Sequence, residues 1–466
     1  MRSVAAVFTR VLLSFAAALF APALLFSARA DLWVAAYYPG WEQSYLAPSQ
    51  IDFTALTHII HFSLVPNADG SLNSADNGIT PAYSADLISR AHTAGRKVLV
   101  CVGGASSETG FQGATTSANL TTFIHNLTNF VAAYGYDGID VDWEPLPVSD
   151  FTQFTNLITG LRSALNGFSP QKLLTAAVGA YPPYGDPPTG QFEMLASLQS
   201  RFDQINIMTY DLAGPYPGWV TWFNAPIYDG GFRFPSTGGL IPSADGSVTN
   251  FLGNGVSPGK LGIGIAFYGD VWAGGSGTST GGPALPRQSW TNTPSATQIA
   301  YRDVMTTYYQ SNLYHWDADA QAAYLSIDNA GSANDKFISY DDEHTCQAKV
   351  SYARNHHLGG VMIWELAQGY RSTRPAGQRD PLLQAIKQSL ATPGIATISR
   401  SGQDIQISFA SLPLGLYRVQ WASNSAAPVW NTLSNNIPGT SGIMRIIDPN
   451  AVSGPRQRFY RVQTPP

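Results

Sequence analysis

The chain has 466 residues, of which 12% are charged and 12% aromatic, and its formal net charge is −5. Average globular chains carry about 25% charged residues, so this composition excludes a coiled coil, a disordered acidic tail and a basic nucleic-acid binder. Many aromatic residues with little charge indicate a partner that is polar but uncharged, and carbohydrate fits that description.

The first thirty residues have the pattern of a secretory signal. Basic residues precede an apolar run at 11–26, and the small-x-small pattern at 28–30 predicts cleavage after Ala30. An uncleaved anchor is the alternative, but the apolar run is shorter than the roughly 20 residues that span a bilayer. Cleavage would remove three Arg and no acid and would change the formal charge from −5 to −8. We therefore expect a secreted monomer that has no membrane contact once this signal is removed.

From residue 31 to about 391, short β-branched runs alternate with amphipathic stretches. The expected strands are 32–38, 57–64, 97–102, 138–143, 173–179, 204–210, 261–268 and 360–365. The expected helices include 84–94, 121–134, 150–165, 342–355 and 381–390. Eight strands alternating with helices predict an α/β fold of the (β/α)8 TIM-barrel type. An open doubly wound sheet is the alternative, but no Gly-x-Gly-x-x-Gly turn follows the first strand.

Two connections are unusually long, 211–243 and 269–338. Both follow the C-terminal ends of predicted strands, which is the face where barrel enzymes build their sites. Both are rich in aromatic residues, and we take Trp222 as a candidate substrate contact.

The pattern changes after residue 393. Alternating segments at 404–409, 417–421, 442–447 and 459–462 predict a C-terminal all-β, sandwich-like module over 394–466. Trp421 or Trp430 could bind glycan there, and a plain packing role is the alternative for both.

The two cysteines are expected to be free thiols. Cys101 ends a predicted inner strand and Cys346 lies on a predicted outer helix, too far apart for a disulfide. The histidines show no metal-ligand spacing. We therefore expect neither a metal nor a cofactor.

The densest acidic cluster of this acid-poor chain lies at 137–144. Strand side chains alternate, so Asp140, Asp142 and Glu144 share one face, with about 7 Å between next neighbours. Their mutual repulsion raises the proton affinity of at least one carboxylate, which can then act as a general acid. A calcium loop or a solvated acidic loop is the alternative, but apolar residues occupy the intervening positions, as in a buried strand.

The segment 137–144 reads Asp-Gly-Ile-Asp-Val-Asp-Trp-Glu and resembles the signature Asp-Gly-x-Asp-x-Asp-x-Glu of the glycoside hydrolase family 18 chitinases. Met-Thr-Tyr-Asp at 208–211 and Gly-Gly-Val-Met-Ile-Trp-Glu at 359–365 strengthen the resemblance, which covers roughly residues 32–390. It also implies a small α+β insertion at 270–338, between the seventh strand and the seventh helix.

The resemblance implies retaining hydrolysis without a protein nucleophile, since this family departs from the usual two-carboxylate scheme. Glu144 would protonate the glycosidic oxygen while the N-acetyl oxygen of the substrate attacks the anomeric carbon. Asp142 would orient the acetamido N–H, Asp140 would poise Asp142, and Tyr210 would hydrogen-bond the acetamido oxygen.

The resemblance also implies the substrate-binding residues. Trp364 would form the floor of the scissile subsite, and the other expected contacts are Tyr37, Trp41, Gly104, Met208, Asp211 and Tyr268. Three positions depart from the family pattern: Ala105 and Pro145 stand where aromatic residues are frequent, and Asp270 stands where an Arg is common.

The expected function is a secreted chitinase acting on chitin or chito-oligosaccharides, with no nucleic-acid partner. Two alternatives stay open, an endo-β-N-acetylglucosaminidase acting on N-glycans and a non-catalytic chitin-binding lectin. Such lectins commonly replace the acid, whereas this chain keeps Glu144.

Overall fold

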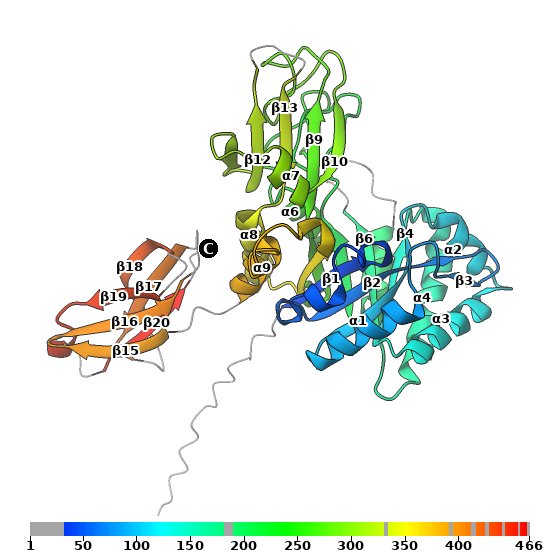
Figure 1. Ribbon diagram of the computed structural model, residues 1–466, viewed down its shortest axis with the longest axis horizontal. Coiled ribbons are helices and arrows are strands. Elements are labelled where there is room, and N and C mark those ends of the chain that lie inside the picture. The colour runs from blue at the N-terminus through cyan, green and yellow to red at the C-terminus, as the bar shows by residue number, and fades with distance from the viewer. Residues whose placement is uncertain are drawn as a thin grey trace, which may run out of the picture. The chain divides into compact units, whose positions relative to one another are not determined.

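The computed structural model describes residues 32–180, 190–329, 334–390, 395–411, 416–424, 428–439, 443–454 and 457–463 (Figure 1). The predicted signal segment and its cleavage after Ala30 lie outside these residues.

Within the described residues, eight parallel strands close into a barrel in the order β1-β2-β4-β5-β6-β7-β8-β14. Their bounds are β1 (Trp33–Pro39), β2 (His58–Pro66), β4 (Lys97–Gly104), β5 (Gly138–Trp143), β6 (Leu173–Gly179), β7 (Gln204–Met208), β8 (Leu261–Ala266) and β14 (Gly360–Trp364). The two-residue strand β3 (Leu72–Asn73) pairs antiparallel with the end of β2. Because β1 pairs with both β2 and β14, the sheet is closed, so the barrel prediction is confirmed and the open sheet is excluded.

Helices cover the outside of the barrel (Figure 1). The predicted ones are α1 (Pro81–Thr93), α3 (Leu120–Tyr134), α4 (Phe151–Asn166), α8 (Glu343–Asn355) and α9 (Pro381–Leu390). Local caps explain two starts, since Thr80 accepts a hydrogen bond from Tyr83 N at the start of α1 and Asp342 accepts one from Thr345 N at the start of α8.

The sequence did not predict four helices: α2 (Glu108–Ala114), α5 (Gln191–Leu198), α6 (Ala244–Gly253) and α7 (Tyr301–Thr307). Three of them, α2, α5 and α7, have only seven or eight residues, so their helical repeat is too short to stand out from the sequence.

An insertion follows the seventh barrel strand. The run 261–268, expected to be one strand, is divided at Phe267, where β8 ends and β9 (Tyr268–Ala273) begins. Phe267 N–H donates to Trp364 O at the end of the barrel strand β14, and Phe267 O accepts from Tyr301 N at the start of α7 (Tyr301–Thr307). Phe267 thus connects the end of β8 to both elements. A five-stranded antiparallel sheet follows in the order β10-β9-β13-β12-β11, with β10 (Ser295–Ala300), β11 (Tyr314–Asp317), β12 (Ala322–Ile327) and β13 (Lys336–Tyr340). With α7, this is an α+β unit between β8 and α8.

The aromatic residues of the two long connections mainly build the core of this insertion. Trp222, Phe223 and Trp272 are fully buried in one hydrophobic cluster. Trp222 Nε1 donates to Pro242 O at 2.8 Å, and the guanidinium of Arg287 lies 5.2 Å from its ring centroid. The expectation that Trp222 contacts substrate is therefore wrong, because its ring fills a protein core that the sequence did not reveal.

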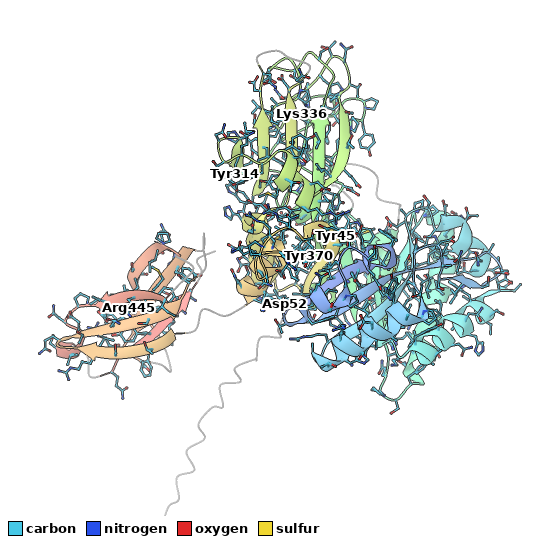
Figure 2. The ribbon with its side chains drawn as sticks, in the orientation of Figure 1. Tyr45, Asp52, Tyr314, Lys336, Tyr370 and Arg445 are labelled. Atoms are coloured by element: carbon cyan, nitrogen blue, oxygen red, sulfur yellow. The ribbon has the colours of Figure 1, made fainter. Side chains whose placement is uncertain are left out.

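Two contacts connect the loops and strands around the barrel mouth. Asp341, directly after β13, accepts hydrogen bonds from Lys349 Nζ at 2.5 Å and from Ala266 N at 3.1 Å, all in the buried interior. Tyr45 and Tyr370, labelled in Figure 2, pack edge to face with ring centroids 6.1 Å apart, and Tyr45 OH donates to Tyr370 O. The Asp341 contacts hold the end of the insertion to β8. The Tyr45–Tyr370 contact holds the connection after β1 against the connection after β14.

The C-terminal module consists of two three-stranded sheets, β15-β16-β19 and β18-β17-β20. The strands are β15 (Ile395–Ser401), β16 (Asp404–Ala410), β17 (Leu416–Ala422), β18 (Asn431–Pro438), β19 (Ile443–Asp448) and β20 (Phe459–Gln463). Both sheets contribute to one buried cluster, Phe409 from the first and Tyr417, Val419, Ile437 and Val462 from the second. The module is therefore a small sandwich, as expected.

Both cysteines are free and buried, which confirms the prediction of two unpaired thiols. In the part of the chain that the structure describes, none of the helices has the length and hydropathy needed to cross a membrane.

Candidate active site

A cleft of about 610 Å³ opens at the C-terminal ends of the barrel strands. It is lined by Tyr37, Trp41, Phe62, Val65, Asn77, Gly103, Gly104, Ala105, Ser106, Ser107, Asp142, Glu144, Gly179, Ala180, Met208, Tyr210, Asp211, Tyr268, Gln298 and Trp364. Ten predicted site residues line it. Asp140 lies beneath it, and Trp222 belongs to the insertion core.

Strand β5 places its carboxylates as the alternation predicts. Ile139, Val141 and Trp143 point into the core between barrel and helices. Asp140 is fully buried inside the barrel, and Asp142 is 3% exposed. Glu144 follows the strand directly and is half-buried at the cleft. One short segment therefore carries a series of carboxyl groups from the barrel interior to the ligand-accessible surface.

Asp140 is held by hydrogen bonds on both of its oxygens. Tyr37 OH donates to Asp140 Oδ2 at 2.7 Å, and Thr175 Oγ1 donates to Asp140 Oδ1 at 2.5 Å. The Cys101 thiol adds a third donor. Burial raises the pKa of Asp140, while these three donors act in the opposite direction. Asp140 thus fixes the position of Tyr37 and places negative charge beneath Asp142.

The carboxyl groups of Asp142 and Glu144 are neighbours at the cleft and interact as a pair that can share one proton. Burial, followed by the charges of Glu144 and Asp140, raises the pKa of Asp142 well above its usual value. Burial also raises the pKa of Glu144, the contact with Asp142 acts in the opposite direction, and the charge of Asp211 raises it further. The pair therefore retains a proton at a pH where an exposed carboxyl group would have lost it.

The two carboxylate oxygens of Asp142 differ in their contacts. Asp142 Oδ1 is buried and has no hydrogen-bond partner among the described residues. Buried polar atoms of this kind are rare in folded proteins, and each one calls for a partner. A ligand N–H group in the cleft would supply that partner.

Tyr210 and Met208 reach the cleft from the end of β7. Tyr210 is 7% exposed, and among the described residues its hydroxyl donates only to the weak acceptor Met362 Sδ, at 3.6 Å. Burial and the charges of Asp142 and Glu144 raise the pKa of Tyr210 well above its usual value. Tyr210 is therefore a neutral hydrogen-bond donor at the bottom of the cleft.

Asp211 is anchored by residues of the insertion. Its Oδ1 accepts from Tyr268 OH at 2.6 Å and from Gln298 Nε2 at 3.0 Å. Asp270, which stands where the family commonly has an Arg, is 5% exposed, and burial with the nearby charge of Asp211 raises its pKa to about 7. The departure at Asp270 thus places a buried acid near Asp211 where the family commonly has a cation.

Aromatic rings form an apolar wall of the cleft. The Trp364 ring lies 5.3 Å from that of Tyr37 and 4.8 Å from that of Phe62, centroid to centroid. Trp41 packs against Phe62 at 5.8 Å and is 49% exposed. Such ring faces bury the apolar side of a sugar while leaving its hydroxyl groups free to hydrogen-bond.

Gly103 and Gly104 leave room for this wall. Both have φ near +107°, a region that favours glycine. A Cβ on Gly104 would lie 2.4 Å from the Phe62 ring, and one on Gly103 would lie 2.0 Å from Asp142 O. Glycine is therefore required at both positions by backbone conformation and by close packing.

Sequence reasoning missed several lining residues, among them Phe62, Asn77 and Gln298. Phe62 lay inside a predicted strand, and the alternation of that strand could have placed it on the inner face. Gln298 comes from the insertion and had no local signal.

The charges of the cleft favour proton retention. Asp142, Glu144 and Asp211 line it, and none of its described lining residues is Lys, Arg or His. The described residues also contain no group of three or more His, Cys, Asp or Glu arranged to hold a metal ion. The arrangement combines a proton-bearing carboxyl pair, a buried acceptor and a neutral hydroxyl donor beside an aromatic wall. It can deliver a proton and hold an amide-bearing sugar.

Comparisons with known proteins agree with this geometry. The sequence profile described as glycosyl hydrolases family 18 matches residues 33–369. Chitinase A1 of Niallia circulans is 30% identical over 378 residues, which are 74% of this chain and 49% of that protein. A probable endochitinase of Caenorhabditis elegans is 29% identical over 307 residues, which are 63% of this chain and 48% of that protein. The chain thus spans about half the length of these two curated relatives.

The fold also matches solved structures. The Group IV chitinase of Ostrinia furnacalis in complex with allosamidin superposes with a TM-score of 0.66 at 24% identity, covering 77% of this chain and 99% of that one. Since the family profile covers all eight barrel strands and the segment 138–144 with its three carboxyl groups, the chain belongs to glycosyl hydrolases family 18.

Proposed function

We propose that this protein is a chitinase that hydrolyses β-1,4 linkages between N-acetylglucosamine units. The observation that carries the proposal is the Asp142–Glu144 pair. One oxygen of Asp142 takes part in a proton-sharing contact with Glu144, and the other is buried without a partner. A substrate that both requires protonation and presents an amide N–H satisfies both features. N-acetylglucosamine has that N–H, whereas glucose does not.

The reaction would proceed in two steps. In the first, Glu144 donates its proton to the glycosidic oxygen, the C1–O bond breaks, and the acetamido carbonyl oxygen forms a bond to C1. Asp142 Oδ1 accepts the acetamido N–H and stabilises the positive charge of the resulting oxazolinium ion. Tyr210 donates a hydrogen bond to the acetamido oxygen and aligns it for attack.

In the second step, the Glu144 carboxylate removes a proton from water and the water oxygen attacks C1. The bond between C1 and the acetamido oxygen breaks, which opens the oxazolinium ring and restores the acetamido group. C1 is inverted twice, so its configuration is retained. Asp140 acts through Asp142, because its charge lies directly beneath that residue and favours a proton there.

Two measurements test substrate assistance. We expect soluble oligosaccharides from fully acetylated chitin, with the β-anomer as the first product in NMR spectra. We expect no cleavage of a fully deacetylated polymer of the same length, because it lacks the attacking carbonyl oxygen. Efficient cleavage of the deacetylated polymer would contradict the mechanism and would direct attention to Asp211, the other carboxylate in the cleft. Binding to chitin without product release would instead indicate a lectin.

We also propose that the protein is exported and acts as a monomer. The basic, apolar and small-x-small segments at 2–30 support export. The expected result is a secreted chain whose N-terminal residue is Asp31, and mass spectrometry of the culture medium checks it. A cell-bound chain that keeps residues 1–30 would contradict export.

A further inference from the structure

The C-terminal module differs in charge from the rest of the chain. Residues 394–466 contain six Arg, no Lys, two Asp and no Glu, which gives a formal charge of +4 in a chain whose total is −5. Both acids are engaged inside the module. Asp448 accepts hydrogen bonds from Arg458 and from Tyr460 OH, and Asp404 accepts one from Asn450 N. With six Arg and two Asp, at least four arginines of the module have no acidic side chain of the module to pair with.

Two of these arginines, Arg418 on β17 and Arg461 on β20, lie on adjacent strands of the β18-β17-β20 sheet. In the β17–β20 register, Arg418 is opposite Gln463 and Gln420 is opposite Arg461. Arg418 and Arg461 are therefore diagonal neighbours on one face, where backbone positions are about 7–8 Å apart. The opposite face of the same strands carries Val419 and other core residues, so the arginines point outward.

Both guanidinium groups donate a hydrogen bond from Nε to the oxygen of a side-chain amide. Arg418 Nε donates to Asn435 Oδ1 at 2.7 Å, and Arg461 Nε donates to Gln420 Oε1 at 2.9 Å. Neither arginine has an ion pair with a described residue. Within the described part of the module, no hydrogen bond engages their terminal Nη groups, which form the planar fork that suits carboxylate and sulfate oxygens.

Trp430 completes this face. The guanidinium carbon of Arg461 lies 4.1 Å from the Trp430 ring centroid. This cation–π contact holds the guanidinium group over the ring. Burial and the charge of Arg418 lower the pKa of Arg461, as expected for two like charges held close together. An anion placed between them would relieve that repulsion.

The other tryptophan of the module offers no such site. Arg458 lies 4.1 Å from the centroid of the Trp421 ring, but its charge is already paired with Asp448. The two Arg–Trp pairs therefore differ in one respect. Arg458 beside Trp421 is paired with Asp448, whereas Arg461 beside Trp430 has no ion pair with a described residue.

We propose that the surface formed by Arg418, Arg461 and Trp430, with Gln420, Asn435 and Thr432 around it, binds an acidic polysaccharide through its carboxylate or sulfate groups. The guanidinium forks suit the anionic groups, while the amide and hydroxyl side chains suit sugar hydroxyl groups. A neutral glycan would leave the two like charges uncompensated. A nucleic acid would need open aromatic faces for base stacking, and Arg461 covers one face of Trp430.

Affinity electrophoresis of the full chain tests the proposal, with polygalacturonate as the carboxylated probe, dextran sulfate as the sulfated probe and dextran as the neutral one. We expect retardation by one or both charged polymers and none by dextran, in spite of the net negative charge of the chain. R418Q/R461Q should raise the Kd by roughly tenfold or more, because two charge-assisted contacts are lost. Added salt should weaken the binding of the unsubstituted protein.

A matched control separates the site from net charge. R400Q/R445Q removes the same charge from exposed positions on the other sheet, where Arg445 is labelled in Figure 2. It should change the Kd by less than about twofold, because screening weakens distant exposed charges. R418K/R461K keeps the charge and should recover part of the binding, which excludes a folding defect as the cause of the loss.

Several results would overturn the proposal. These are absent binding by the unsubstituted protein, equal weakening in the two Gln double variants, no recovery in the Lys variant, and tighter retention on DNA or anionic lipid vesicles than on the acidic polysaccharides. Release of chito-oligosaccharides from a short soluble substrate should be the same in all variants, so the test is independent of the proposed catalytic function.

Discussion

Replacing Glu144 with Gln should lower kcat on chito-oligosaccharides by about 10²- to 10⁴-fold, which is the range that a positioned general acid contributes. Gln has nearly the same shape as Glu and can still hydrogen-bond with Asp142, but it cannot release a proton to the glycosidic oxygen. The initial rate of release of soluble sugars, with the KM from the same curves, is the measurement. KM should change little, because Glu144 acts on the transition state more than on the bound substrate.

The control for this variant is Glu193→Gln, which changes an exposed residue of α5 in the same way. It should leave kcat unchanged. If Glu144→Gln retains most of the activity and the same alkaline limit, another group is the acid.

Replacing Asp142 with Asn should lower kcat by about 10²- to 10³-fold, as the loss of one preorganised electrostatic contact to a developing charge does. The substituted side chain would present a neutral amide in place of the carboxylate that accepts the acetamido N–H, and so would stabilise the oxazolinium ion poorly. Both kcat and kcat/KM should fall, because the contact strengthens only as the charge develops.

The same variant should change the pH dependence. The pKa of Asp142 and that of Glu144 are both raised, so the carboxyl pair keeps its proton as the pH rises and loses it only above the usual range of these groups. In the unsubstituted protein, losing the last proton of the pair places two negative charges side by side, which opposes that loss. In Asp142→Asn no second carboxylate is present, so the remaining proton is lost at lower pH. The alkaline limb of the kcat profile should therefore shift to lower pH.

The pH profile of Asp303→Asn, which changes an exposed acid of α7, serves as the reference. An alkaline limb that stays in place in Asp142→Asn would mean that Glu144 titrates independently of Asp142. It would contradict the proton-sharing pair on which the proposed mechanism rests.

Much of the barrel could be predicted from the sequence because its signals are local. Each strand is a short apolar run, and the alternation of side chains along β5 separates Ile139, Val141 and Trp143 from the carboxylates. The family motifs added the roles of these residues. The interaction of Asp142 with Glu144, and the lack of a partner for Asp142 Oδ1 among the described residues, are properties of the tertiary structure.

The insertion shows where local signals fail. Trp222 looked like a ligand contact because it is aromatic and follows a barrel strand, yet it packs in a core assembled from segments far apart in the chain. For the same reason the division of the run 261–268 at Phe267 was not visible, since hydrogen bonds to Trp364 and Tyr301 cause it.

The sequence by itself determined the barrel, the acidic strand end and the all-β character of the module, because strand periodicity and a clustered motif depend on neighbouring residues alone. Only the tertiary structure decided that Gln298 anchors Asp211 and that Arg418 lies beside Arg461. Both pairings depend on which strands become neighbours in a sheet, and that choice is made by long-range packing rather than by local pattern.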